Sequence, residues 1–275
     1  MKNIVRLLII SSLIAFNSVS ASAQRGYEVG GFLGAGWYFG DLNPDFRLGH
    51  PGPAVGLIGR HNFNERIGVA LTGKYTFVQG IDAWSENPFQ RARNLSFRSN
   101  IFDIGGRFEF NFMRYKHGSE DYWFTPYVFG GLSVFVFNPK AELDGEWYAL
   151  RELGTEGQFT GEEYYTLQPA INYGMGLKFD INYEWSINIE IDARRLWTDY
   201  LDDVSTVYAD KLELEALRGP IAVALSDRSI PDSNFPQIGE AGRQRGDSQS
   251  TDIYGMVKIG LMYYFGEIRC PEILY

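Results

Sequence analysis

Residues 66–77 have the sequence RIGVALTGKYTF, and this stretch decides the fold class. Its side chains alternate between two kinds, mostly apolar at one position and small or polar at the next. One face holds Ile67, Val69, Leu71, Gly73, Tyr75 and Phe77, and the other holds Arg66, Gly68, Ala70, Thr72, Lys74 and Thr76. A period of two over this length predicts a β-strand with one apolar and one polar face.

The same alternation recurs along the chain and predicts eight strands. These strands cover residues about 27–39, 53–63, 65–78, 100–113, 124–137, 167–181, 184–197 and 252–265. Their length suits tilted strands that cross a bilayer and project beyond it.

The connections between the predicted strands alternate between long and short. In chain order they are residues 40–52, Asn64, 79–99, 114–123, 138–166, 182–183 and 198–251. Long loops alternating with short turns, together with an even strand number, are typical of outer-membrane barrels. We therefore predict an all-β fold, a transmembrane antiparallel β-barrel over residues 24–265. Both termini would face the periplasm, and the long loops would lie outside the cell.

The composition agrees with a β-protein. Of the 275 residues, 31 are glycine, and aromatic residues make up 16% of the chain. Glycine and aromatic residues are poor helix formers, which argues against a helical bundle, and the aromatic content excludes intrinsic disorder. The net charge of −9 argues against a nucleic-acid partner. A single cysteine excludes a disulfide-linked scaffold.

The first residues have the pattern of an export signal. Lys2 and Arg6 precede an apolar run over residues 7–16, and Ala21-Ser22-Ala23 matches a cleavage site for small residues. We expect residues 1–23 to be a signal peptide. After them, no apolar stretch is long enough to form a transmembrane helix.

A soluble β-sandwich or lipocalin-like barrel is the alternative fold, with its apolar face inward and its polar face toward water. Aromatic residues near the strand ends favour the membrane barrel, because they match interfacial girdles. These aromatics are Tyr27, Trp37, Phe39, Phe77, Phe112, Trp123, Trp197, Tyr263 and Phe265.

The polar faces carry balanced charge, which suits a closed interior in which ions pair. The basic residues are Arg66, Lys74, Arg107, Lys178, Arg194 and Lys258, and the acidic residues are Glu28, Asp103, Glu109, Asp180, Glu190 and Asp192. We expect Arg107, Glu109, Lys178, Glu190, Asp192 and Arg194 to form an interior charge network. Because eight strands leave room only for side chains inside, the barrel should be plugged.

Catalysis is not favoured by the residue pattern. A Ser-His-acid arrangement at the outer leaflet needs a histidine there. Of the three histidines, His61 and His117 fall on the periplasmic side, and His50 lies beside Gly49 and Pro51 in a predicted turn. Phosphate-binding and metalloprotease motifs are missing from the sequence. We expect no cofactor, and a lipid-A-modifying enzyme is the least favoured alternative.

The outer loops are acidic. Segment 138–166 holds seven acidic and two basic residues. Asp199, Asp202 and Asp203 could hold calcium through oxygen ligands, or Asp203 or Ser205 could cap a helix that we predict over residues 206–218, ending at Gly219. Acidic loops also fit a small surface barrel, either an adhesin or a narrow porin, that binds ligands outside the cell.

Cys270 lies in a predicted periplasmic tail, residues 266–275. A lone cysteine in an exported protein suggests an intermolecular disulfide. The alternative is a free thiol without a role.

Several loop motifs resemble those of the PorG family, small outer-membrane proteins of the type IX secretion and gliding-associated machinery. The similarity runs through nearly the whole mature chain, and TDYLDDVS, from Thr198, is its most specific part. The motifs are Tyr38-Phe39-Gly40-Asp41-Leu42-Asn43, Arg93-Asn94-Leu95-Ser96-Phe97, Gly154-Thr155-Glu156-Gly157-Gln158, Thr198 to Tyr208, Leu225-Ser226-Asp227-Arg228-Ser229 and Arg245-Gly246-Asp247.

The resemblance implies a structural subunit of the protein secretion machinery. Such a barrel ties a periplasmic ring, built of a lipoprotein and its partner, to the outer membrane and connects it to the translocon barrel. Cys270 would then pair with a cysteine of the ring lipoprotein. The motif residues in the outer loops would pack over the barrel mouth or touch the translocon: Gly40, Asp41, Arg93, Asn94, Gly154, Thr155, Glu156, Asp199, Asp202, Asp203, Asp227 and Arg228.

Overall fold

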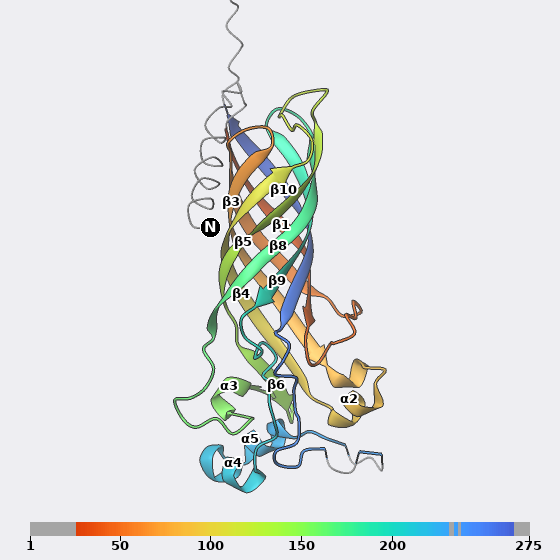
Figure 1. Ribbon diagram of the computed structural model, residues 1–275, viewed down its shortest axis with the longest axis vertical. Coiled ribbons are helices and arrows are strands. Elements are labelled where there is room, and N and C mark those ends of the chain that lie inside the picture. Colours follow the sequence, from red (N-terminus) through yellow and green to blue (C-terminus); the bar gives the residue numbers. More distant parts are fainter. Residues whose placement is uncertain (1–25, 231–233, 236–237, 267–275) are drawn as a thin grey trace, which may run out of the picture.

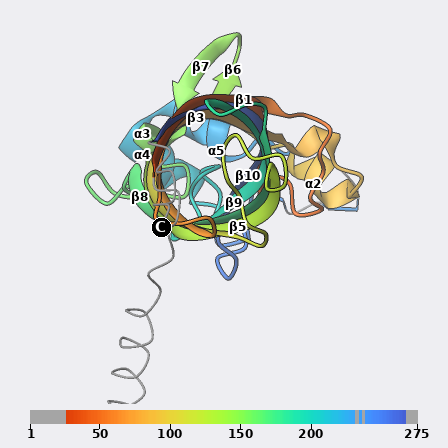
Figure 2. The same ribbon diagram turned by 90° about the horizontal axis from the view of Figure 1, so that it is seen from above.

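Eight long strands form a closed antiparallel barrel in the computed structural model, which describes residues 26–230, 234–235 and 238–266. Each strand pairs with its neighbours in the order β3-β2-β1-β10-β9-β8-β5-β4, and β3 pairs with β4 to close the ring (Figures 1 and 2). The strands are β1 (Gly26–Phe39), β2 (Gly52–Asn62), β3 (Ile67–Ile81), β4 (Ser96–Asn111), β5 (Phe124–Val136), β8 (Leu167–Asp180), β9 (Trp185–Leu196) and β10 (Ile253–Gly266). The predicted fold class is confirmed.

The strand edges differ from the prediction at the first short turn. Asn64 alone was expected between β2 and β3, but the turn takes residues 63–66. The Asn64 side chain accepts hydrogen bonds from the backbone N–H groups of Arg66 and Ile67, at 2.8 and 2.9 Å. This local bonding fixes a longer turn, and Arg66 consequently lies outside the strand.

The two ends of the barrel differ. One end carries the short connections and both described chain ends, because Gly26 pairs with Gly266; we call it the turn end. The other, the loop end, carries the long loops, which fold into a cap (Figure 1). The cap contains η1 (Asp82–Trp84), α2 (Pro88–Arg93), β6 (Pro139–Leu143), β7 (Glu146–Ala149), α3 (Leu150–Leu153), α4 (Lys211–Arg218) and α5 (Pro220–Ser226). Among the described residues, no helix has the length and apolar content needed to cross a membrane.

The helix predicted in the last loop begins later than expected. Helix α4 starts at Lys211, and the side chain of Asp210 caps it by accepting from the N–H groups of Leu212 and Glu213. The prediction of Asp203 or Ser205 as the cap is therefore wrong. The helix ends at Gly219 as predicted.

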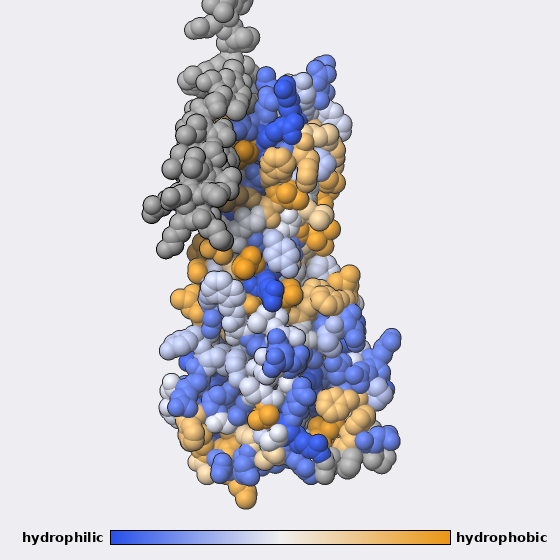
Figure 3. Space-filling view, viewed as in Figure 1, coloured by the Kyte–Doolittle hydropathy of each residue, from blue (hydrophilic) through white to orange (hydrophobic). Residues whose placement is uncertain are grey.

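The barrel wall is apolar outside and polar inside. Outward side chains such as Leu33, Leu57 and Phe108 are 64%, 70% and 69% exposed. Inward side chains of the same strands are buried and many of them are charged. Figure 3 shows apolar side chains over the wall and a more hydrophilic cap below it. A soluble barrel would have the opposite arrangement.

Apolar side chains fill the loop end of the ring and continue into the cap. This cluster includes Tyr38, Ala54, Val78, Phe97, Ile101, Phe135, Phe137, Ala170, Leu196, Leu201, Val204 and Leu225. The barrel mouth is thus closed by packed side chains, and the cap rests on a continuous core.

Candidate functional site

Buried ion pairs fill the barrel near the turn end. Arg60 Nη1 lies 2.5 Å from the Glu28 carboxylate, and Arg60 Nε lies 2.7 Å from Glu109. Lys178 Nζ lies 2.8 Å from Glu109. These contacts join β2, β1, β4 and β8 across the interior.

The pairing continues along the interior. Arg107 contacts Glu109 and forms a two-pronged bond to Glu190, at 2.6 and 2.8 Å. Lys258 Nζ lies 2.9 Å from Glu190 and 2.5 Å from Asp192. A guanidinium that bonds a carboxylate through two nitrogens, as Arg107 bonds Glu190, forms one of the strongest polar contacts in proteins.

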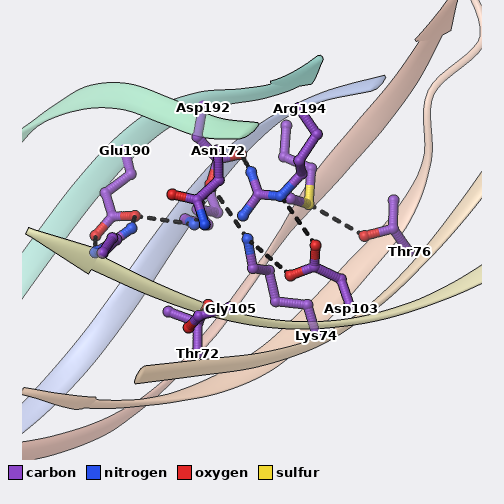
Figure 4. A network of polar contacts seen from close by, with 12 residues as sticks. Thr72, Lys74, Thr76, Asp103, Gly105, Asn172, Glu190, Asp192 and Arg194 are labelled. Carbon is purple, nitrogen blue, oxygen red and sulfur yellow. Dashed lines mark hydrogen bonds and ion pairs between the residues drawn. The ribbon is translucent and has the colours of Figure 1, made fainter. Parts of the chain in front are cut away.

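A third set of ions lies closer to the loop end (Figure 4). Arg194 Nε contacts Asp103 at 3.3 Å, and its Nη1 lies 3.0 Å from Asp192. Lys74 lies 3.6 Å from Asp103 and 3.7 Å from Asp192, and the Tyr254 hydroxyl donates to Asp103. The charged side chains in these three sets are at most 5% exposed, so the lumen is filled by paired ions.

Two positions differ from the predicted interior. Arg66 is exposed at the turn, where it donates to the Phe112 carbonyl, and Arg60, which the sequence analysis did not single out, is fully buried instead. His117 is also buried: its Nδ1 lies 2.7 Å from Asp180, and its ring stacks on Tyr264. The turn that carries His117 therefore closes the turn end.

A second polar network joins the four loops of the cap, and Glu156 lies at its centre. The Glu156 carboxylate accepts from the backbone N–H groups of Ser205 and Thr206, at 2.9 and 3.1 Å, and from the Thr206 hydroxyl at 2.6 Å. Arg245 Nη1 donates to the same carboxylate at 3.1 Å. One buried side chain of the third loop thus binds several donors of the fourth.

Two arginines extend this network to the other loops. Arg245 also donates to the Asp203 carbonyl, and its Nη2 lies 3.7 Å from the Asp203 carboxylate. Arg93 donates to the carbonyl of Arg245 at 2.7 Å and to the carbonyl of Asp41 at 2.8 Å, and it pairs with Asp82. We call Asp41, Arg93, Glu156, Asp203 and Arg245 the loop clasp, because they join all four long loops.

Most other motif residues lie beside the clasp. Thr155 donates to Asp203, and Tyr38 donates to Asp202. A Cβ at Gly40 would collide with Tyr38 and Asp252. Three further hydrogen bonds flank these residues: Asn94 donates to the Arg228 carbonyl, Arg228 donates to Ser96, and Lys211 donates to Asp227. Gly154 adopts a left-handed conformation at the end of α3.

The cap holds carboxyl groups under electrostatic strain. Burial raises the pKa of Asp199 to about 8, and repulsion from Asp41, Asp247 and Glu156 adds to this effect. Burial also raises the pKa of Asp41 to about 6. Protonation of such groups would relieve repulsion between the loops.

Two of the three carboxylates named for the calcium alternative already accept hydrogen bonds. Asp202 bonds Tyr38, whereas Asp203 bonds Thr155 and Tyr164. Within residues 26–230, 234–235 and 238–266, no three His, Cys, Asp or Glu side chains gather in a way that could hold a metal.

The two other histidines considered in the sequence analysis lie outside both polar networks. His50 stacks on Trp84 between two loops, with ring centroids 3.5 Å apart. His61 contacts Tyr27 and Phe63 at the turn end. Cys270 and the expected signal peptide lie outside the described residues.

Solved outer-membrane barrels have a similar overall fold. OprG of Pseudomonas aeruginosa is 11% identical, with 91% of this chain and 100% of that chain covered and a TM-score of 0.45. Neisserial surface protein A is 9% identical, with 87% and 97% covered and a TM-score of 0.43. Ail of Yersinia pestis is 11% identical, with 89% and 100% covered and a TM-score of 0.39.

No curated protein sequence matches the chain. Residues 5–218 match the family described as "Domain of unknown function (DUF6089)", and the chain belongs to this family.

Proposed function

We propose that this member of the DUF6089 family is an outer-membrane protein whose capped loops face the cell exterior. The observation that carries this proposal is the apolar outer wall around an interior of paired ions. In a bilayer, a closed barrel satisfies all strand hydrogen bonds and exposes apolar side chains to lipid. In water, the same wall would expose a large apolar surface.

The filled lumen and the clasped loops support a structural role over transport or catalysis. A porin needs an open channel, but ions and apolar side chains fill this barrel from end to end. Loops that are cross-linked by Glu156, Arg245 and Arg93 form a fixed surface, which suits docking to another protein.

The sequence resemblance narrows this role to the type IX secretion machinery. The motif residues that carry the resemblance converge on the cap, which supports a shared purpose for them. We propose that the barrel anchors the periplasmic ring, built of a lipoprotein and its partner, and links it to the translocon barrel. Because β10 ends at the turn end, the tail with Cys270 would leave the barrel on the periplasmic side.

An affinity pull-down from detergent-solubilised outer membranes tests this role. Wild type and the Cys270→Ser variant are compared on non-reducing gels. We expect both proteins to recover a ring lipoprotein, and only the wild type to show a band in which the two proteins are covalently linked. Recovery of the barrel alone in both samples would contradict the machine-subunit role and favour a free-standing surface barrel that binds ligands.

A further inference from the structure

Two cations lie side by side where the outer wall of the barrel meets the β6–β7 hairpin, without an acidic partner among the described residues. Arg98 on β4 pairs in register with Lys140 on β6, so both side chains lie on the same face of the sheet. Neither side chain forms an ion pair or donates a hydrogen bond within the described part of the chain. Glu142 lies on the same face, two residues beyond Lys140, and is exposed. Like charges directly opposite each other repel, so this pair favours a bound anion.

Trp147 holds the arginine in place. The Arg98 guanidinium carbon lies 3.1 Å from the centre of the Trp147 ring. Trp147 belongs to the β6–β7 hairpin, which stands outside the barrel ring (Figure 2). Stacking on a ring fixes the guanidinium plane and leaves its edge free, and that edge matches a phosphate.

The height of the pair on the wall indicates the source of the phosphate. Outward residues of β4 and the turn that follows it are exposed and mostly apolar from Phe102 to Phe112, a stretch that fits the roughly 25 Å apolar band of a tilted barrel strand. Arg98 lies four residues beyond Phe102, or about 10 Å higher along the barrel axis at a rise of about 3.4 Å per residue and the usual tilt. That position is at the level of lipid headgroups.

We propose that Arg98, Lys140 and Trp147 form a binding site for the phosphate group of an outer-leaflet lipid. The acyl chains of that lipid lie on the apolar wall below, beside Phe102 and Val136, which are 58% and 44% exposed. The inference rests on the proposed outer-membrane location with the loop end outward. A lipid bound there would give the cap a fixed contact with the membrane.

Native mass spectrometry of the full-length protein tests the site, with lipid A that carries its phosphates, dephosphorylated lipid A and inorganic phosphate as probes. The R98Q/K140Q double variant should bind phosphorylated lipid A about tenfold more weakly, because it loses charge-assisted hydrogen bonds. R195Q is the matched control, because Arg195 is an exposed outward arginine whose cross-strand neighbours are the apolar Ile171 and Ile253. It should bind as wild type does.

Equal binding of both lipids, or unchanged binding by the double variant, would overturn the site. Binding of inorganic phosphate as tight as that of phosphorylated lipid A would overturn the lipid as its source. Insertion of each variant into phosphate-free bilayers is measured in parallel. Normal insertion with no phosphate preference would remove only the lipid site, whereas failure of wild type to insert would count against the outer-membrane location.

Discussion

Glu156 and Arg245 are 89 residues apart in the chain and form a buried ion pair between two loops. The Oε1 and Nη1 atoms lie 3.1 Å apart, and the side chains are 1% and 2% exposed. Removal of one partner from such a pair leaves a buried charge without compensation. The pair therefore provides a direct way to loosen the cap while leaving the barrel intact.

Arg245→Gln should open the cap. We expect the local free energy of cap opening to fall by roughly 3–5 kcal/mol, because Glu156 and Asp203 keep their buried charges. Hydrogen exchange of loop amides measures this change. Arg243→Gln is the control, because Arg243 lies in the same loop, is 53% exposed and lies 3.9 Å from Glu240. Equal exchange in both variants would show that the clasp does not hold the loops.

Arg107→Ala should destabilise the barrel. Loss of the Arg107 guanidinium leaves Glu109 and Glu190 short of a buried partner. We expect this to lower the free energy of unfolding by roughly 3–5 kcal/mol. The urea midpoint for unfolding in detergent measures the effect. Arg66→Ala removes an exposed arginine from the turn and should leave the midpoint nearly unchanged. An unshifted midpoint for Arg107→Ala would contradict the interior pairing.

The stability of the cap should fall as the pH rises. Burial raises the pKa of Asp199 from 3.8 to about 8, so the folded state holds this proton more tightly than the unfolded state. The contribution of Asp199 is therefore most favourable below about pH 4 and is lost as the pH rises to about 8. Asp199→Asn should lower this pH dependence of the unfolding temperature, whereas Asp45→Asn, at an exposed loop carboxylate, should keep it. Identical pH profiles for the two variants would contradict the assignment.

The purified barrel should not conduct ions. Paired ions and apolar side chains fill its interior, and an eight-stranded barrel encloses little more than its own side chains. Recordings in planar bilayers should show no steps above the baseline. Reproducible single-channel steps would favour the narrow-porin alternative.

The barrel could be predicted from the sequence because the side chains of every strand must point alternately toward lipid and toward the interior. This rule says nothing about turn length, which is why Arg66 was placed inside. Arg60 was missed because the inward positions of β2 before it, Ala54, Gly56 and Ile58, are small or apolar, so only Arg60 and Asn62 at the strand end are polar. Its role depends on Glu28 and Glu109 from other strands.

The cap was less predictable because its contacts are distant in the chain. Arg93 and Arg245 are 152 residues apart, and nothing local to either indicates the other. The loop motifs included Glu156 and Asp203, but they did not indicate which residues these two side chains would contact. The β6–β7 hairpin was also missed, because strands of five and four residues are too short for alternation to stand out.

A membrane barrel requires that the outer wall meets lipid and that the cap meets water. Nitroxide labels on Leu132→Cys and Leu212→Cys, each in a Cys270→Ser background and a lipid bilayer, test it directly. Both residues are exposed, at 65% and 79%, the first on the barrel wall and the second on cap helix α4. In a membrane barrel, we expect oxygen to relax the label at 132 and the bilayer to shield it from a water-soluble nickel chelate. We expect the reverse at 212. Access of the chelate to the label at 132 would mean that the wall faces water, and would contradict the membrane barrel.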